Sequence, residues 1–194
     1  MVILLKTILK NVENEFIIKN SRFITLLFKI ENDNITSYLN YAKEKYPKAT
    51  HYCYAYIYND YKKASDDNEP SNTAGSPMLN VLEKEKLNHV LAITVRYFGG
   101  IKLGAGGLIR AYSKSVTEAL KLAQYKELEK GYKIKITFNY NQEKQIDYIL
   151  NNAQIISKEF SEDITYIALI NKSTLDKLND YNFEIIENNL IKKA

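Results

Sequence analysis

The sequence has little of the chemistry that forms disulfides or binds transition metals. Its 194 residues include one cysteine and two histidines, and they include no tryptophan. A single cysteine excludes an internal disulfide bond, and so few His and Cys side chains argue against a zinc site. Cys53 alternates with apolar neighbours, so we interpret it as a small buried residue rather than as a nucleophile.

Long apolar runs are also absent from the sequence. No run approaches the ~18 residues that are needed to cross a bilayer, so we expect no membrane partner. The first ten residues, MVILLKTILK, are apolar but lack a basic leader and a small-residue cleavage site, which argues against a signal peptide. With one cysteine and no export signal, the sequence predicts a protein of the reducing cytoplasm.

Charge is mild and unevenly distributed. The formal net charge is +4, with 27 basic and 23 acidic residues. Residues 1–124 hold 17 of the basic and 12 of the acidic residues, so the excess of positive charge lies in this part. This balance permits an anionic partner such as RNA but does not require one.

The residue pattern divides the chain into two predicted domains, 1–124 and 125–194. The boundary falls where a long helical stretch gives way to the polar segment YKELEKGY, which we interpret as a linker. The second part follows the order β-α-β-β-α-β, which is the ferredoxin-like arrangement. The first part is mixed, so the expected class is α+β. Its expected elements are a hairpin over 15–30, helices over 35–46, 76–86 and 105–123, and strands over 51–58 and 90–97.

Side chains are expected to cap two of these helices. Asp33 stands before the first helix, and Ser76 followed by Pro77 is typical of a helix start. The strand HYCYAYIY places four tyrosines on one face. Tyrosine rings can stack on nucleic-acid bases, but we expect this row to pack under a helix.

One stretch concentrates the scarce glycine of the chain. Five of the seven glycines lie in RYFGGIKLGAGGLIRAY, residues 96–112, between a predicted central strand and a helix. The spacing matches neither a Walker loop nor a dinucleotide-binding fingerprint. Ordering five glycines costs roughly 2.5–5 kcal/mol relative to alanine, which another interaction must offset. Two explanations stay open: close backbone packing, or backbone N–H groups that face an anionic ligand at the start of the helix.

Cationic side chains surround these glycines. On the helix, Arg110, Lys114 and Lys121 share the face opposite to the apolar residues. An ordinary solvated face has the same pattern, and Arg96 at a strand end could serve only in an ion pair, so both interpretations stay open. The predicted anion- or nucleic-acid-binding residues are Arg96, Gly99, Gly100, Lys102, Gly104, Gly106, Gly107, Arg110 and Lys114.

The segment NDYKKASDDNEPSNTAG, residues 59–75, has neither a helix nor a strand pattern. Loops of this length inside a domain are usually functional or disordered. Its carboxylates could bind Mg²⁺ beside a phosphate, or they could pair with basic groups of the glycine-rich stretch at residues 96–112. A third interpretation is a flexible solvated loop. Beyond this conditional Mg²⁺ we expect no cofactor and no metal site, and no catalytic residue stands out. The loop residues of interest are Ser65, Asp66, Asp67, Glu69, Ser71 and Thr73.

Two of these stretches resemble the signature of a known family. SDDNEPSNTAG at Ser65–Gly75, followed by RYFGGIKLGAGGLIRAY at Arg96–Tyr112, is similar to the pattern of the YigZ/Impact family. SRFI at Ser21–Ile24 and HYCYAY at His51–Tyr56 also fit this pattern. The resemblance is strongest over residues 15–122.

Three positions depart from the family pattern. Asn68 and Asn72 stand where the family usually has glycine, and asparagine tolerates positive φ, so we expect both turns to be kept. Ser76 stands where a basic residue is common, which weakens any phosphate site at that helix start.

The resemblance implies a first domain with the fold of ribosomal protein S5 domain 2 and a second like the last domain of elongation factor G. Both belong to translation machinery that contacts RNA. Eukaryotic Impact proteins regulate a translation-control kinase through protein contacts, and no reaction is established for bacterial members.

The leading hypothesis is therefore a cytoplasmic protein that binds RNA or the ribosome and is linked to the regulation of translation. Its site would be a groove between the acidic segment at residues 59–75 and the glycine-rich stretch at residues 96–112. One alternative is an enzyme or binding protein for a phosphorylated small molecule or nucleotide. The other is a protein-interaction module. Between enzyme and binding protein, the sequence favours a binding protein.

Overall fold

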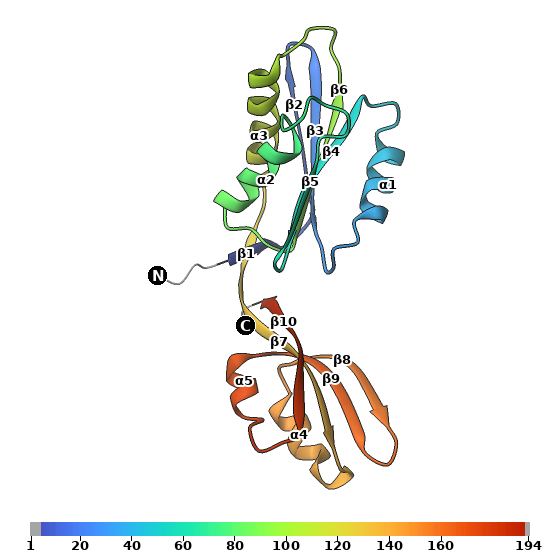
Figure 1. Cartoon of the computed structure of the whole chain (residues 1–194), viewed down its shortest axis with the longest axis vertical. Coiled ribbons are helices and arrows are strands. Elements are labelled where there is room, and N and C mark those ends of the chain that lie inside the picture. Colours follow the sequence, from blue (N-terminus) through green and yellow to red (C-terminus); the bar gives the residue numbers. More distant parts are fainter. Residues whose placement is uncertain (1–4, 193–194) are drawn as a thin grey trace. The chain divides into compact units, whose positions relative to one another are not determined.

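The computed structural model describes residues 5–192 of a mixed α/β protein with two antiparallel sheets (Figure 1). The chain divides into two compact units, residues 1–127 and 128–194. Within the described range, no helix is both long enough and apolar enough to cross a membrane. Residues 1–4, which begin the stretch tested above for a signal peptide, lie outside this range.

The first unit is built on an antiparallel sheet with the strand order β2-β3-β6-β4-β5. Strand β6 lies at the centre and pairs with β3 on one side and β4 on the other. Its nearly continuous apolar sequence fits burial on both faces, and the prediction of a central strand here is confirmed. The strands are β2 (Val12–Ile18), β3 (Ser21–Lys29), β4 (His51–Tyr58), β5 (Tyr61–Ser65) and β6 (Val90–Tyr97).

Helices cover both faces of this sheet, with α2 and α3 on one face and α1 on the other (Figure 1). Because strand side chains alternate, each face has its own apolar core. Cys53 and Ala55 face α2 and α3, whereas Tyr52, Tyr54 and Tyr56 face α1, so the tyrosine row packs under a helix as predicted. The helices are α1 (Thr36–Lys45), α2 (Gly75–Lys84) and α3 (Ala105–Lys121).

The second unit follows the predicted order β-α-β-β-α-β, and its strands are arranged β10-β7-β9-β8. Alternate residues of β7, including Ile134, Ile136 and Phe138, pack into the core of this unit. The elements are β7 (Tyr125–Phe138), a single 3-10 turn (Tyr140–Gln142), α4 (Glu143–Ile149), β8 (Gln154–Phe160), β9 (Ile164–Asn171), α5 (Lys172–Asp176) and β10 (Phe183–Lys192).

The predicted linker Tyr125–Tyr132 is wrong, because this segment forms the first part of β7. Its polar side chains are compatible with a strand since Lys130 pairs with Leu190 of β10, which satisfies the backbone. Upstream, the short strand β1 (Leu5–Ile8) was not anticipated. Just after it, the backbone N–H of Leu9 donates to the carbonyl of Gln124 at 2.8 Å.

The predicted loop over 59–75 is also too long. Tyr61–Ser65 forms strand β5, which pairs with β4 in a hairpin, and α2 already begins at Gly75. The irregular segment is therefore only residues 66–74, which we call the acidic loop. The residue pattern indicates no strand here because the lysine side chains of β5 are exposed at the edge of the sheet, so they do not alternate with apolar residues.

Candidate functional site: the loop–turn pocket

A pocket of about 430 Å³ lies between the acidic loop and the glycine turn, residues 98–107, which runs from the end of β6 into the first turn of α3. We call it the loop–turn pocket. The acidic loop and the glycine turn, selected separately from the sequence, therefore lie on opposite sides of one cavity. Strands β4 and β6 and helix α3 complete it. The lining residues are Thr50, His51, Glu69, Pro70, Arg96, Phe98, Lys102, Leu103, Gly104, Ala105 and Leu108.

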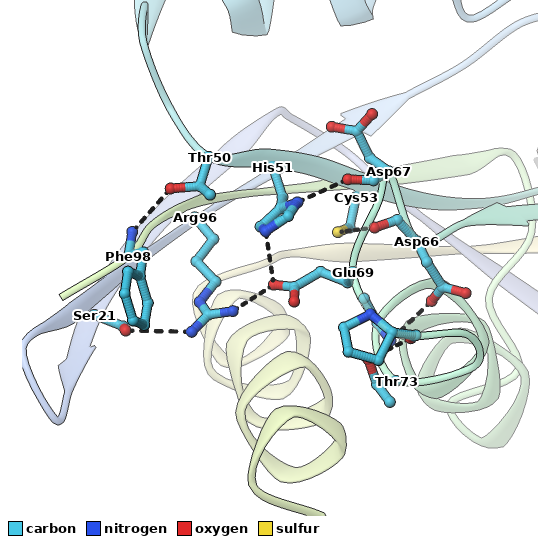
Figure 2. A network of polar contacts seen from close by, with 12 residues as sticks. Ser21, Thr50, His51, Cys53, Asp66, Asp67, Glu69, Thr73, Arg96 and Phe98 are labelled. Atoms are coloured by element: carbon cyan, nitrogen blue, oxygen red, sulfur yellow. Dashed lines mark hydrogen bonds and ion pairs between the residues drawn. The ribbon is translucent and has the colours of Figure 1, made fainter. Parts of the chain in front are cut away.

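The carboxylate of Glu69 is the centre of a buried polar network beside this pocket (Figure 2). Its Oε1 accepts hydrogen bonds from Arg96 Nη1 at 2.6 Å and from the hydroxyl of Tyr112 at 2.7 Å. The Nε2 atom of His51 lies 3.7 Å from the same oxygen. A buried carboxylate is tolerated when its charge is paired and its lone pairs are filled, so Glu69 ties the acidic loop to β6 and α3.

Arg96 is an ion-pair residue. Its side chain is only 5 % exposed, and its guanidinium lies between the rings of Phe23 and Phe98, at 5.4 and 5.6 Å from their centroids. Its Nη2 donates to the hydroxyl of Ser21 at 3.4 Å, while its Nε has no hydrogen-bond partner among the described residues. Of the two interpretations of Arg96, the structure therefore favours the ion pair over a freely available cation.

Cys53 and Tyr112 extend the network away from solvent. The Cys53 sulfur lies 3.3 Å from the Tyr112 hydroxyl and 3.0 Å from the carbonyl oxygen of Asp66. Burial raises the pKa of the Cys53 thiol and of the Tyr112 hydroxyl far above their ordinary values, so both stay protonated at neutral pH. The interpretation of Cys53 as a buried small residue is confirmed.

The other two carboxylates of the acidic loop bind backbone N–H groups. Asp66 Oδ1 accepts from the N–H groups of Ala74 and Gly75, both at 2.9 Å, so this carboxylate caps the start of α2. Asp67 Oδ2 accepts from the N–H of Tyr52 at 2.6 Å. Among residues 5–192, no three His, Cys, Asp or Glu side chains are grouped as metal ligands would be.

Both predicted helix caps are wrong. Ser76 lies inside α2, whose N-cap is Ala74, and Asp66 supplies the acceptor there. Helix α1 has Ile35 at its N-cap, and the N–H of Thr36 donates to the side-chain oxygen of Asn34 at 3.2 Å rather than to Asp33. In both helices the N-cap residue is apolar, Ala74 in α2 and Ile35 in α1, whereas the sequence pattern predicted a polar side chain there.

Internal hydrogen bonds hold the acidic loop in one conformation. The Thr73 hydroxyl donates to the carbonyl of Pro70 at 2.6 Å, and the Ser65 hydroxyl accepts from the N–H of Asp67 at 3.3 Å. Ser71 is exposed, and its hydroxyl accepts from the side chain of Asn72 at 3.3 Å. Asn68 and Asn72 have φ values of 65° and 62°, which confirms that asparagine keeps both turns.

The glycines of the turn have different roles. A side chain at Gly99 would collide with the backbone of Asn20, so Gly99 is needed for close packing. Gly100 and Gly104 have φ values of 83° and 70°, which favour glycine. Gly106 instead has room for a side chain, because an added Cβ would make an ordinary contact at 3.7 Å with Arg110 Nη1. Close packing therefore explains only some of these glycines, and backbone N–H groups that face an anionic ligand stay a prediction for the others.

The predicted cations are only partly brought together. Arg96 and Lys102 line the loop–turn pocket, whereas Arg110 and Lys114 lie exposed on α3 outside its lining. Gly107 also lies outside the lining, where an added Cβ would be 3.0 Å from that of Leu103. On the same helix, Lys121 pairs with Glu118 at 2.8 Å, so that part of the basic stripe is an ordinary solvated face.

Three residues of the site were not selected from the sequence. Tyr112 lies on the apolar face of α3, so its pattern indicates a core residue, although its hydroxyl donates to Glu69. His51 pairs in register with Arg96 across β4 and β6, and this pairing is the signal that would have placed both beside Glu69. Phe98 follows β6 directly and is 47 % exposed, so no burial pattern marks it.

Comparison with known proteins gives consistent matches. The family described as the Impact N-terminal domain matches residues 19–120. The IMPACT family member YvyE of Bacillus subtilis is 37 % identical over 179 residues, which cover 89 % of this chain and 82 % of the relative. The IMPACT family member YigZ of Escherichia coli is 39 % identical over 110 residues, 54 % of each chain. A crystal structure described as a hypothetical protein has a TM-score of 0.77 and 26 % identity, covering 96 % of this chain and 99 % of that one.

Proposed function

Because this chain belongs to the IMPACT family, we propose that it is a cytoplasmic protein that binds RNA or the ribosome and is linked to the regulation of translation. The observation that supports this function most directly is the loop–turn pocket, in which the two stretches that resemble the family signature face each other.

The charges around the pocket favour an anionic partner. The Glu69 carboxylate is neutralised by Arg96, and Asp66 and Asp67 turn their oxygens toward backbone N–H groups. Lys102 lines the pocket and forms no ion pair with any residue in 5–192. Helix α3 starts beside it without a side-chain cap, and its dipole adds partial positive charge there.

Salt-dependent RNA binding tests this function. Titration of labelled single-stranded RNA at two salt concentrations should show weaker binding at high salt. The double variant Lys102→Ala/Arg110→Ala should bind more weakly and should lower the slope of log affinity against log salt by about 1.4, since each phosphate contact contributes ~0.7.

The matched control is Lys43→Ala/Lys63→Ala, which also removes two exposed charges of the first unit but takes them from α1 and β5 rather than from the glycine turn and α3. Its affinity and salt slope should equal those of the wild type. Wild-type binding that ignores salt, or equal binding by both double variants, would contradict an electrostatic RNA site.

We also propose the finer fold assignments for the two units. The strand order β10-β7-β9-β8 with two connecting helices supports a ferredoxin-like second unit, similar to the last domain of elongation factor G. The first unit, with three helices on a five-stranded sheet, is assigned the fold of ribosomal protein S5 domain 2 on the strength of the family resemblance.

A second candidate function is binding of, or catalysis on, a phosphorylated small molecule. The pocket volume of about 430 Å³ supports it, because small-molecule sites span roughly 300–1,000 Å³. A thermal-shift screen of nucleotides with and without Mg²⁺ distinguishes the candidates, and the absence of any shift argues against this one. A protein partner that stays bound after nuclease treatment would instead favour a protein-interaction module.

A further inference from the structure

Phe98 presents an aromatic ring to solvent at the loop–turn pocket. The residue is 47 % exposed although it is fully apolar, and it lines the pocket. Figure 2 shows its ring beside the guanidinium of Arg96, which lies 5.6 Å from the ring centroid. The ring therefore has a buried cation on one side and remains accessible elsewhere.

Hydrogen bonds at Phe98 and at the next residue hold the backbone that carries the ring. The N–H of Phe98 donates to the hydroxyl of Thr50 at 3.0 Å, and the N–H of Gly99 donates to the hydroxyl of Ser21 at 3.2 Å. Close packing of Gly99 against Asn20 leaves this part of the turn no room to move inward. This part of the turn is therefore preorganised for a partner, because little backbone freedom is lost on binding.

The accessible charge beside this ring is positive. Of the ionisable residues that line the pocket, Glu69 and Arg96 form a buried pair, and the His51 ring lies 3.7 Å from the same carboxylate. Lys102 is exposed and forms no ion pair with another described residue. An aromatic face next to an unpaired cation is the combination that binds nucleotides, since the base stacks on the ring and the phosphate meets the cation. A purely apolar peptide would leave the lysine without a partner.

We propose that the loop–turn pocket takes one unpaired nucleotide of RNA, with its base stacked on Phe98 and its phosphate at Lys102. This inference rests on the proposed function and adds that the RNA must be single-stranded at the pocket, because duplex bases are covered by their neighbours. The tyrosines of β4 cannot supply this stacking platform, since they pack under α1.

A tryptophan reporter tests the stacking directly. The chain contains 16 tyrosines and no tryptophan, so Phe98→Trp introduces a single tryptophan at the pocket, which is excited selectively at wavelengths that tyrosine does not absorb. Titration with a single-stranded RNA oligonucleotide should quench its fluorescence with the same midpoint as anisotropy of the labelled oligonucleotide. The control Phe160→Trp replaces an exposed phenylalanine of β8 and should show no quenching. Binding seen by anisotropy without quenching of the Phe98→Trp signal would overturn the inference.

An affinity series completes the test. Phe98→Ala should weaken binding of the single strand about 5- to 150-fold, the loss of one stacked base, and should leave the salt slope unchanged. Ile101→Ala is the matched control, because Ile101 is also 47 % exposed and lies in the same turn but does not line the pocket. Thermal unfolding checks that both variants are folded.

The outcomes separate this inference from the proposed function. If Phe98→Ala binds single-stranded RNA as the wild type does, the stacking inference is wrong and the proposed function stands. The same holds if the wild type binds a duplex of the same sequence as tightly as the single strand. If the wild type binds no RNA at all, the proposed function fails and this inference fails with it.

Discussion

Glu69 shows how one side chain links an irregular segment to a regular fold. Its carboxylate joins the acidic loop to Arg96 on β6 and to Tyr112 on α3. The side chain is only 3 % exposed, so water contributes little to stabilising its charge. The loop therefore owes its position to a pairing between residues that are 27 and 43 positions apart in the chain.

Replacing Glu69 by glutamine should destabilise the protein strongly. Glu69→Gln keeps the shape of the side chain but leaves the Arg96 charge buried without a counter-ion, which costs about 3 kcal/mol or more. Urea unfolding followed by circular dichroism measures the loss. The control Glu44→Gln removes an exposed charge of α1 and should change the free energy of unfolding by less than about 0.5 kcal/mol.

A double variant separates lost charge pairing from lost packing. Glu69→Gln/Arg96→Gln removes both charges, so it should be more stable than Glu69→Gln alone. If the double variant is the less stable of the two, the buried charge is not the cause of the destabilisation.

At the residue scale, the sequence predicted the backbone conformation of single residues better than it predicted their hydrogen-bond partners. Asn68 and Asn72 were predicted to keep turns with positive φ, which rests only on local sterics, and both do so. The cap predicted for Ser76 was wrong because the carboxylate of Asp66, ten positions earlier, accepts the N–H at the start of α2 and Ser76 lies inside the helix. Local chemistry can be inferred from neighbours in sequence, but competition between distant acceptors cannot.

At the scale of elements, the glycine turn combines two unlike requirements. Gly99 packs where a side chain would meet the backbone of Asn20, whereas Gly106 lies in the first turn of α3 and has room for a side chain. Composition alone cannot distinguish these roles, because both positions are simply glycine in one short stretch. The β2–β3 turn that Gly99 packs against lies far away in the sequence.

Alanine at these two glycines should have opposite effects on stability. Gly99→Ala should lower the free energy of unfolding by about 1–3 kcal/mol, because the added methyl group forces backbone apart. Gly106→Ala should raise it by about 0.5–1 kcal/mol, since alanine is the better helix former. Chemical denaturation measures both changes, and a destabilised Gly106→Ala would show that this position is packed after all.

Two of the strand segments that the sequence missed have side chains that do not show their pairing. Strand β5 carries exposed lysines on an edge, and the first part of β7 carries charges on exposed positions. By contrast, β4 and β6 were predicted with their observed bounds because burial imposes apolar or alternating patterns on them. Periodicity reports burial, so it detects central strands and overlooks solvent-exposed ones.

At the scale of the molecule, the sequence pattern predicted the order of elements in the second part but left the order of strands within each sheet open. Strand order depends on contacts between distant segments, such as β3 beside β6 in the first sheet. The loop–turn pocket has the same origin. Its two sides were chosen separately, and their meeting depends on that strand order rather than on any local motif.

The apolar cores of the described residues each draw their members from one unit only. Two cores lie in the first unit and one in the second. A cavity cut into one core should therefore weaken that unit and spare the other. Ile136 is fully buried in the core of the second unit, and Leu27 is fully buried in the first.

Hydrogen exchange should reveal this independence. Ile136→Ala should destabilise the second unit by about 2–5 kcal/mol through lost burial and the cavity that remains. Amides of β7 and β9 between residues 133 and 170 should then exchange faster, while those of β6 keep their wild-type protection. Leu27→Ala should give the reverse pattern, with faster exchange in β6. If Ile136→Ala accelerates exchange in β6 as much as in β9, the two units unfold together and the cores are coupled.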